Sequence, residues 1–111
     1  WWEEDAFKTK RFYNMMLNHE GEAPEYCEPW LNREIVVQHL YSPAMWCVFQ
    51  LQDLMGMSAT IRREDPREER INNPSEPEHY WNYRMHINLE DLLKKTDFNE
   101  ELKGYVHASG R

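Results

Sequence analysis

Apolar residues recur at helical spacing in the first part of the chain. They share one face over residues 3–17, which predicts a helix there. Asn32 can cap a second helix over 33–41, and Ser42-Pro43 ends it because the residue before a proline disfavours helical geometry. Residues 19–29, which carry acids together with glycine and prolines, form the loop between the two helices.

Residues 44–50 form the most continuous apolar run of the chain, and apolar positions do not alternate with polar ones. This pattern predicts a short strand that is buried on both faces. A helix, a short turn and a buried strand make up half of a parallel α/β unit. A further turn over 51–55, closed by Gly56, follows the predicted strand.

The second half of the chain is more polar. Residues 58–79 contain almost no large apolar side chain, and loops of that length are usually functional or disordered. Apolar and polar side chains then alternate over 81–88, a period-2 pattern. Capping-box patterns predict short helices over 89–95 and 97–104, followed by a loose tail over 105–111.

Composition fits a single small domain with an unusual core. Leu, Ile, Val and Phe make up only about a fifth of the 111 residues, so five Trp, six Tyr and six Met must supply much of the buried area. The chain starts with Trp1-Trp2, without an initiator methionine or a signal-peptide pattern. We therefore expect a piece of a longer protein whose apolar faces partly require a neighbour.

Charge and cysteine content narrow the function classes. A net charge of -7 argues against nucleic acid and anionic membranes as partners, and no apolar stretch approaches the roughly 20 residues of a membrane helix. The isolated Cys27 and Cys47 indicate reduced thiols of a cytoplasmic protein, with a disulfide as the less favoured alternative. The five histidines lack the i, i+4 pairing of zinc sites, so we expect no metal site.

Several polar residues near the predicted strand and loop suit a neutral, hydroxyl-rich ligand such as a sugar. Asn72 offers both a donor and an acceptor to vicinal hydroxyls, although an ordinary Asx-Pro turn with Pro74 explains it equally well. Gln52 and Asp53 lie just past the predicted strand, where barrel enzymes keep active-site groups. A capping or loop-bracing role is the slightly favoured alternative for Asp53.

The aromatic and charged residues of the loop have plainer explanations. Trp81 and Tyr83 can stack on a sugar ring, but aromatics that alternate with polar residues more often belong to a core. Arg84 in such a place more often braces a loop than contacts a ligand. The charge run over 62–70 interleaves both signs, which indicates a solvated, internally paired loop face. Nothing fixes its carboxylates at the roughly 5 Å separation of a retaining glycosidase pair.

Five sequence segments occur in a distinctive order. They are Trp1-Trp2-Glu3-Glu4-Asp5, residues 38–46, residues 49–56, Arg70-Ile71-Asn72-x-Pro74 and His79-Tyr80-Trp81-x-Tyr83-Arg84-Met85. Together they resemble the C-terminal end of the 4-α-glucanotransferases of glycoside hydrolase family 77, the amylomaltases and disproportionating enzymes. The resemblance covers nearly the whole chain and points to the larger disproportionating type of plants and some bacteria.

The resemblance implies a (β/α)8 barrel enzyme that transfers segments of an α-1,4-glucan to glucose or another glucan without a cofactor. It implies a retaining mechanism with an Asp nucleophile, a Glu acid/base and a second, supporting Asp. In the family these carboxylates lie upstream of the position that matches Trp1. We therefore expect no catalytic residue in this chain and no activity from the chain alone. Residues 1–111 are then a single C-terminal segment of the barrel, comprising the last helix-strand unit and the closing helices.

The same resemblance assigns roles to individual residues. Residues 44–50 match the eighth strand, and Asn72 matches an Asn that approaches bound glucan. Gln52 and Asp53 match a strand-end pair that shapes the site. The residues expected to brace the loop structurally are Trp81, Tyr83 and Arg84.

Removing one strand from a parallel barrel leaves it without hydrogen-bonding neighbours. We therefore expect a mostly helical chain in which residues 44–50 are covered by its helices or by a partner chain, self-association being one way to cover them. The natural partners are the rest of the barrel and an α-glucan or maltooligosaccharide. A rival hypothesis is an autonomous carbohydrate-binding or interaction module with Trp81 and Tyr83 as a stacking platform.

Overall fold

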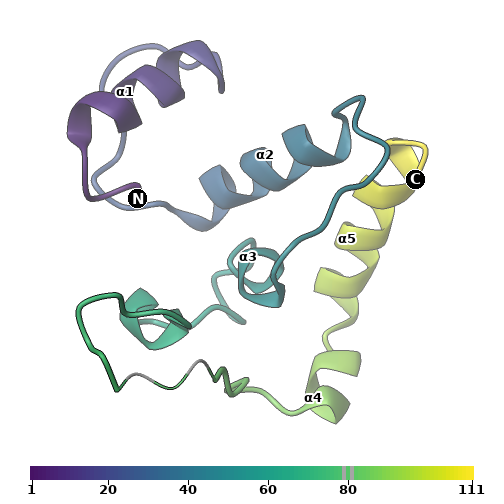
Figure 1. The fold of residues 1–111 in the computed structure, drawn as a ribbon. Helices are drawn as coiled ribbons and strands as arrows, with labels where there is room; N and C mark the ends of the chain where they lie inside the picture. Colours follow the sequence, from purple (N-terminus) through teal and green to yellow (C-terminus); the bar gives the residue numbers. More distant parts are fainter. Residues whose placement is uncertain (79, 81) are drawn as a thin grey trace.

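The computed structural model covers Trp1–Arg111 and describes every residue except 79 and 81. Within that described part, every regular element is a helix (Figure 1). The elements are α1 (Ala6–Met15), α2 (Pro29–Leu40), α3 (Leu51–Met55), the short 3-10 helix η1 (Pro66–Glu69), α4 (Leu89–Leu93) and α5 (Thr96–Ala108). The expectation of a helical chain is confirmed, and the expected strand is not.

The first two helices begin where local chemistry satisfies their free backbone amides. Asp5 caps α1, since its carboxylate accepts the N–H of Lys8 at 3.0 Å. Pro29 occupies the first turn of α2, where its missing N–H costs nothing. The predicted cap at Asn32 was therefore wrong, because proline starts this helix one turn earlier.

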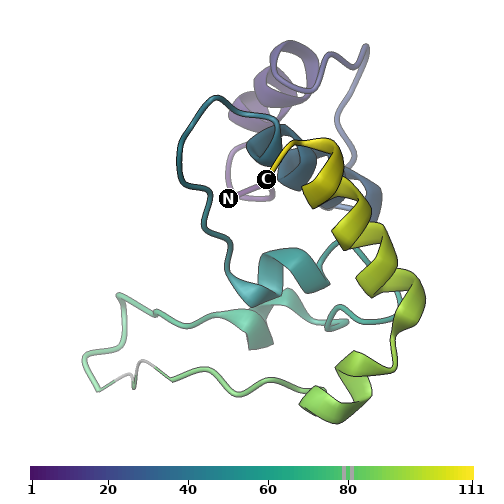
Figure 2. The same ribbon diagram turned by 90° about the vertical axis from the view of Figure 1, so that its right-hand side faces the viewer.

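Residues 44–50 do not form the predicted buried strand. They are an extended link from α2 to α3 that runs along one edge of the molecule (Figure 2). Met45, Trp46 and Val48 are 87%, 81% and 88% exposed, so the expectation that the chain's own helices cover this segment was also wrong. A strand needs a hydrogen-bonding neighbour, and the described residues supply none.

The C-terminus is not a loose tail. Helix α5 continues to Ala108, and Gly110 follows in the left-handed region at φ +78°. The N–H of Gly110 bonds to His107 O and that of Arg111 to Val106 O, which together make a Schellman motif. Only glycine takes this φ without strain, and the turn directs Arg111 back toward the end of α2.

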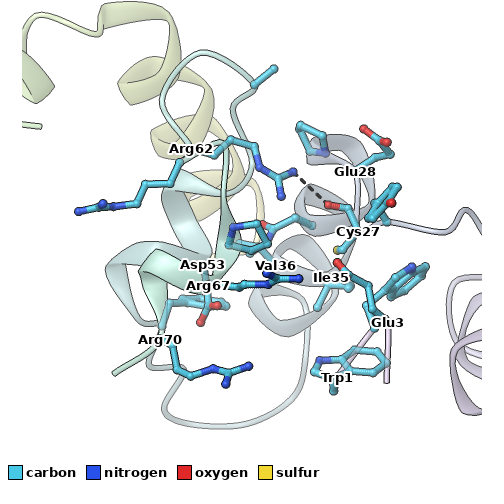
Figure 3. Close-up of a pocket in the computed structure, with 18 of the residues that line it drawn as sticks. Trp1, Glu3, Cys27, Glu28, Ile35, Val36, Asp53, Arg62, Arg67 and Arg70 are labelled. Atoms are coloured by element: carbon cyan, nitrogen blue, oxygen red, sulfur yellow. Dashed lines mark hydrogen bonds between the residues drawn. The ribbon is translucent and has the colours of Figure 1, made fainter. Parts of the chain in front are cut away.

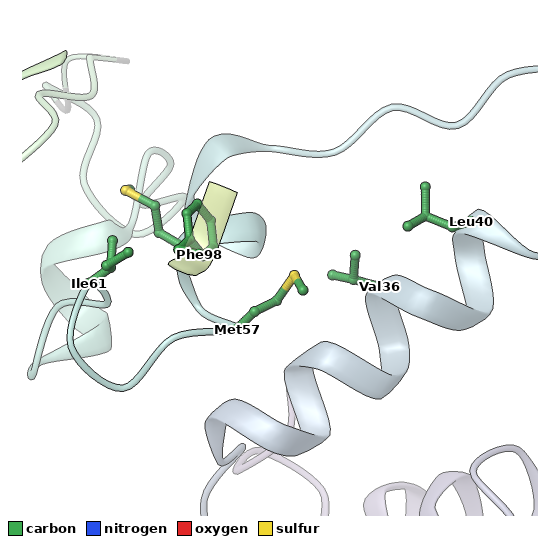
Figure 4. Packing of buried hydrophobic residues seen from close by; sticks show 6 residues of the cluster. Val36, Leu40, Met57, Ile61 and Phe98 are labelled. Carbon is green, nitrogen blue, oxygen red and sulfur yellow. The ribbon is translucent and has the colours of Figure 1, made fainter. Parts of the chain in front are cut away.

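Two apolar clusters hold the helices together. The larger one contains Val36, Leu40, Met55, Met57, Ile61 and Phe98 (Figure 4). The smaller one joins the α1 region to α2 through Trp2, Leu17 and Leu31. Helix α2 contributes to both clusters and contacts α3 and α5, so it is the central element of the fold.

The period-2 pattern near residue 83 corresponds to alternating burial of side chains. The segment nevertheless pairs with no strand in the described chain. Tyr83, Met85 and Ile87 are half-buried and pack against the larger cluster. Arg84 and His86, between them, are more exposed. The explanation of the alternating aromatic Tyr83 as part of the core is therefore confirmed for this residue.

Candidate functional site

A cavity of about 1120 Å³ opens between the N-terminal residues, α2 and the segment that follows α3 (Figure 3). Its lining combines aromatic rings with charged side chains of both signs. The aromatic residues are Trp1, Trp2, Tyr26 and Phe49; the arginines are Arg62, Arg63, Arg67 and Arg70; the carboxylates are Glu3, Glu4, Glu28, Asp53 and Glu64. Flat apolar faces beside strong hydrogen-bonding groups suit a polyhydroxylated ligand.

Asp53 and Gln52 are neighbours in α3 but face different surroundings. Asp53 is exposed and lines the cavity. Gln52 is half-buried and does not line it, and the Gln52 Nε2 atom is inaccessible to solvent without a hydrogen-bond partner among the described residues. A buried donor without a partner costs about 1–3 kcal/mol, so this amide is poorly satisfied by the chain itself.

Asn32 is a cavity residue that the sequence did not single out as a site. Its side chain lines the cavity, and its Oδ1 atom is buried without a hydrogen-bond partner in the described chain. A Cβ atom on Gly56 would lie 2.7 Å from Asn32 Nδ2, so any larger residue there would force the Asn32 side chain to shift. The local pattern gave Asn32 a capping role and could not reveal the contact, which joins α2 to the end of α3.

Asn72 lies outside this cavity. It is exposed on the loop that follows η1, two residues beyond Arg70, which does line the cavity. The turn at this place is made by Asn73, whose side-chain oxygen accepts the Ser75 N–H at 3.3 Å. The structure therefore does not bring Asn72 into one cavity with Asp53.

The three residues expected to brace the loop have different surroundings. Tyr83 packs against the larger cluster, and its burial, together with the nearby Glu69 carboxylate, raises the pKa of its hydroxyl to about 12. The Arg84 backbone carbonyl accepts a hydrogen bond from Arg63 Nη2 at 3.0 Å, while the residue itself is exposed. Trp81 lies outside the described residues, and its role stays a prediction.

The charge run over 62–70 is internally paired, as expected, but it is not fully solvated. Arg63 contacts Glu68 at 2.6 Å and Glu69 at 3.2 Å. The Glu68 side chain is 58% exposed, whereas that of Glu69 is only 19% exposed. Alternating charges in sequence gave no sign of which carboxylate turns inward.

Comparison with known proteins decides the family. The model of the 4-alpha-glucanotransferase family, glycoside hydrolase family 77, matches residues 1–90. The chain belongs to this family. Among curated proteins, 4-alpha-glucanotransferase DPE2 of Oryza sativa subsp. japonica is 40% identical over 111 residues, an alignment that covers 100% of this chain and 12% of the rice protein. No solved structure matches the chain significantly.

The family member described here thus spans about an eighth of the length of that curated relative. Both cysteines of this family member, Cys27 and Cys47, are free thiols. Burial is the main cause that raises the pKa of the Cys27 thiol, so the unreactive protonated form is favoured. Within the described residues, the longest helices fall short of the length and apolarity needed to cross a lipid bilayer.

Proposed function

We propose that this chain is the C-terminal segment of the catalytic barrel of a 4-α-glucanotransferase, which transfers α-1,4-glucan segments to glucose or another glucan with retention. The observation that carries the proposal is the family match over residues 1–90 together with 40% identity, over the whole of this chain, to an enzyme named for this activity. A covalent glycosyl-enzyme suits transfer, because a sugar hydroxyl can then compete with water as the acceptor. No cofactor is required.

The exposure of segment 44–50 supports the proposal that this segment belongs to a larger sheet in the full-length protein. Met45, Trp46 and Val48 expose most of their side chains, an arrangement that costs free energy in water. The chain covers 12% of the rice relative, so most of such a polypeptide lies outside these residues. We propose that strands of the same polypeptide pair with 44–50 on both edges, and that this segment is the last strand of the barrel.

The residues proposed to meet the glucan are Asn72, Gln52 and Asp53. Asp53 already lines the aromatic and charged cavity, and Asn72 presents an exposed amide nearby in sequence to cavity-lining Arg70. Gln52 precedes Asp53 in α3, and its buried Nε2 has no hydrogen-bond partner among the described residues, a cost that a partner from the rest of the barrel would remove. The carboxylates that carry the chemistry come from the preceding part of the enzyme, so this segment contributes binding.

Kinetics of the full-length protein test the role of Asn72. Asn72→Ala is expected to lower kcat/KM for transfer from maltotriose by about 10- to 100-fold, since one lost hydrogen bond to a charged or developing-charge site costs about 1.5–3 kcal/mol. Asn82→Ala is the matched control, because Asn82 is also an exposed asparagine and lies in the following segment. Equal effects of the two substitutions would remove Asn72 from the proposed site.

The binding-module alternative has a separate test. Tyr83 packs against the larger cluster, which limits the ring area available to a ligand. Maltooligosaccharide titration of the 111-residue chain, followed by tryptophan fluorescence, is expected to show no millimolar binding. Millimolar or tighter binding that is lost in Trp81→Ala and kept in Asn72→Ala would favour the module over the enzyme segment.

A further inference from the structure

A polar cluster closes the base of the loop that carries Asn72. Arg63 lies at the centre of this cluster. Its Nη1 donates to Glu68 Oε2 at 2.6 Å, and its Nη2 donates to Arg84 O at 3.0 Å. Its Nε lies 3.2 Å from Glu69 Oε1. One guanidinium therefore joins η1, which precedes the loop, to the extended segment that follows it. The planar fork of arginine can donate to Glu68 and to Arg84 O while its charge lies beside Glu69, which a lysine ammonium cannot do in the same geometry.

His86 makes a second connection across the same base. Its Nε2 lies 2.7 Å from Ile61 O, and because a carbonyl only accepts, Nε2 carries the hydrogen. Its Nδ1 lies 3.6 Å from Glu69 Oε1. The His86–Ile61 hydrogen bond therefore joins the segment after the loop to the residue that ends the α3 region, and it places the imidazole beside the Glu69 carboxylate.

Glu69 is sheltered from water. Its side chain is 19% exposed, and both carboxylate oxygens and the Tyr83 hydroxyl are inaccessible to solvent and have no hydrogen-bond partner among the described residues. A sheltered carboxylate depends on its cationic neighbour, because removing the partner leaves an uncompensated charge. Exposed ion pairs such as Arg63–Glu68 contribute little by comparison.

From this geometry we infer that Glu69, held by Arg63, is a positioning residue that fixes the base of the loop that carries Asn72 and so determines where Asn72 meets the substrate. Glu69 does not line the cavity, whereas Arg63 does, so the carboxylate acts through its neighbours. The effect on substrate binding through Asn72 rests on the proposed function. The closure of the loop base stands on the contacts alone.

Hydrogen exchange of the 111-residue chain tests the closure without any assay of activity. The Arg70 amide, which bonds to Arg67 O, and the Arg62 amide, which bonds to Ser58 O, report on the two ends of the η1 region. Glu69→Gln is expected to speed exchange at both amides about tenfold, since the cluster no longer resists local opening. Glu64→Gln, which removes an exposed carboxylate nearby, is the control and is expected to change neither amide. Unchanged exchange in Glu69→Gln would overturn the closure.

A double-mutant cycle in the full-length enzyme tests the consequence for substrate. Glu69→Gln alone is expected to lower kcat/KM about tenfold, mainly through a higher KM, because the loop is misplaced and the reacting groups are intact. In an Asn72→Ala background the same substitution is expected to have almost no further effect. Additive losses would overturn the positioning role and indicate a general loss of structure.

Arg63→Lys covers the case in which Glu69→Gln fails to fold. This variant keeps a positive charge beside Glu69 and loses the fork to Arg84 O, so it is expected to fold and to reproduce the KM effect. If the wild-type full-length enzyme transfers no glucan, the proposed function fails while the exchange result still decides the closure. A KM effect absent from Arg63→Lys and from Glu69→Gln, in an active enzyme, would overturn the inference.

Discussion

Replacing Arg111 with alanine tests whether the last residue of the chain holds α2 and the start of the 44–50 segment in place. The guanidinium donates through Nε to Leu40 O at 2.7 Å, and through Nη2 to Ser42 O at 2.8 Å and Ala44 O at 2.7 Å. Leu40 O belongs to the last turn of α2, where backbone carbonyls lack helical partners and a cation is favourable. The substitution leaves these three acceptors to water.

The expected loss follows from the number and setting of these hydrogen bonds. A net contribution of about 0.5–1.5 kcal/mol is usual for each bond, and charged donors reach higher values when buried. Arg111 is solvent-exposed, so the lower part of that range applies to each acceptor. We expect Arg111→Ala to lower the free energy of unfolding by about 2 kcal/mol, a change of about 30-fold in the folding equilibrium.

Urea unfolding, followed in parallel by tryptophan fluorescence and far-ultraviolet circular dichroism, measures this change. Arg111→Lys is expected to recover only part of it, because an ammonium cannot match the spread of the three carbonyls. Arg11→Ala, which truncates an exposed arginine on α1, is the control and should change stability by less than about 0.5 kcal/mol. A loss of unfolding free energy in Arg111→Ala no larger than that in Arg11→Ala would refute this role of Arg111.

Three further predictions concern the core, an alkaline titration and a helix cap. Phe98→Ala in the larger cluster should cost about 3–5 kcal/mol in the same urea assay, whereas Phe7→Ala on the surface should cost little. Because the pKa of Tyr83 is raised to about 12, its contribution to stability is present below about pH 10 and is lost as pH rises toward 12. Tyr83→Phe should therefore remove one late-titrating tyrosinate absorbance step and flatten the alkaline loss; a wild-type titration without a late step would contradict this. The backbone hydrogen bond from Lys8 lowers the pKa of Asp5, so the stability it contributes is lost as pH falls below about 4, and Asp5→Asn should flatten that acid limb.

The helices could be predicted from the sequence because their signals are local. Apolar spacing located both N-terminal helices, and the error at the start of α2 arose from choosing Asn32 over the equally local Pro29 signal. The apolar run at 44–50 predicted a buried strand, which was wrong for the described chain, where Met45, Trp46 and Val48 are exposed. It could not indicate that the described chain contains no strand to pair with it.

The site and its supports depend on contacts between residues far apart in sequence. Arg111 bonds to residues about 70 positions earlier, although it lies in a segment that the sequence predicted to be a loose tail. The Glu69 carboxylate turns inward beside Arg63 and His86, and a run of mixed charges is compatible with either orientation. The residue types therefore indicated which side chains could bind a ligand. Which of these side chains lie together could be seen only in the folded chain.

The central claim is that this chain is one segment of a 4-α-glucanotransferase whose catalytic carboxylates lie outside it. Incubation with maltotriose, followed by separation of the products, tests the claim when the full-length protein and the 111-residue chain are compared side by side. We expect the full-length protein to release glucose and form longer maltooligosaccharides, and the 111-residue chain to form neither. Glucose released by the chain alone, or a full-length protein that makes no transfer product, would contradict the account.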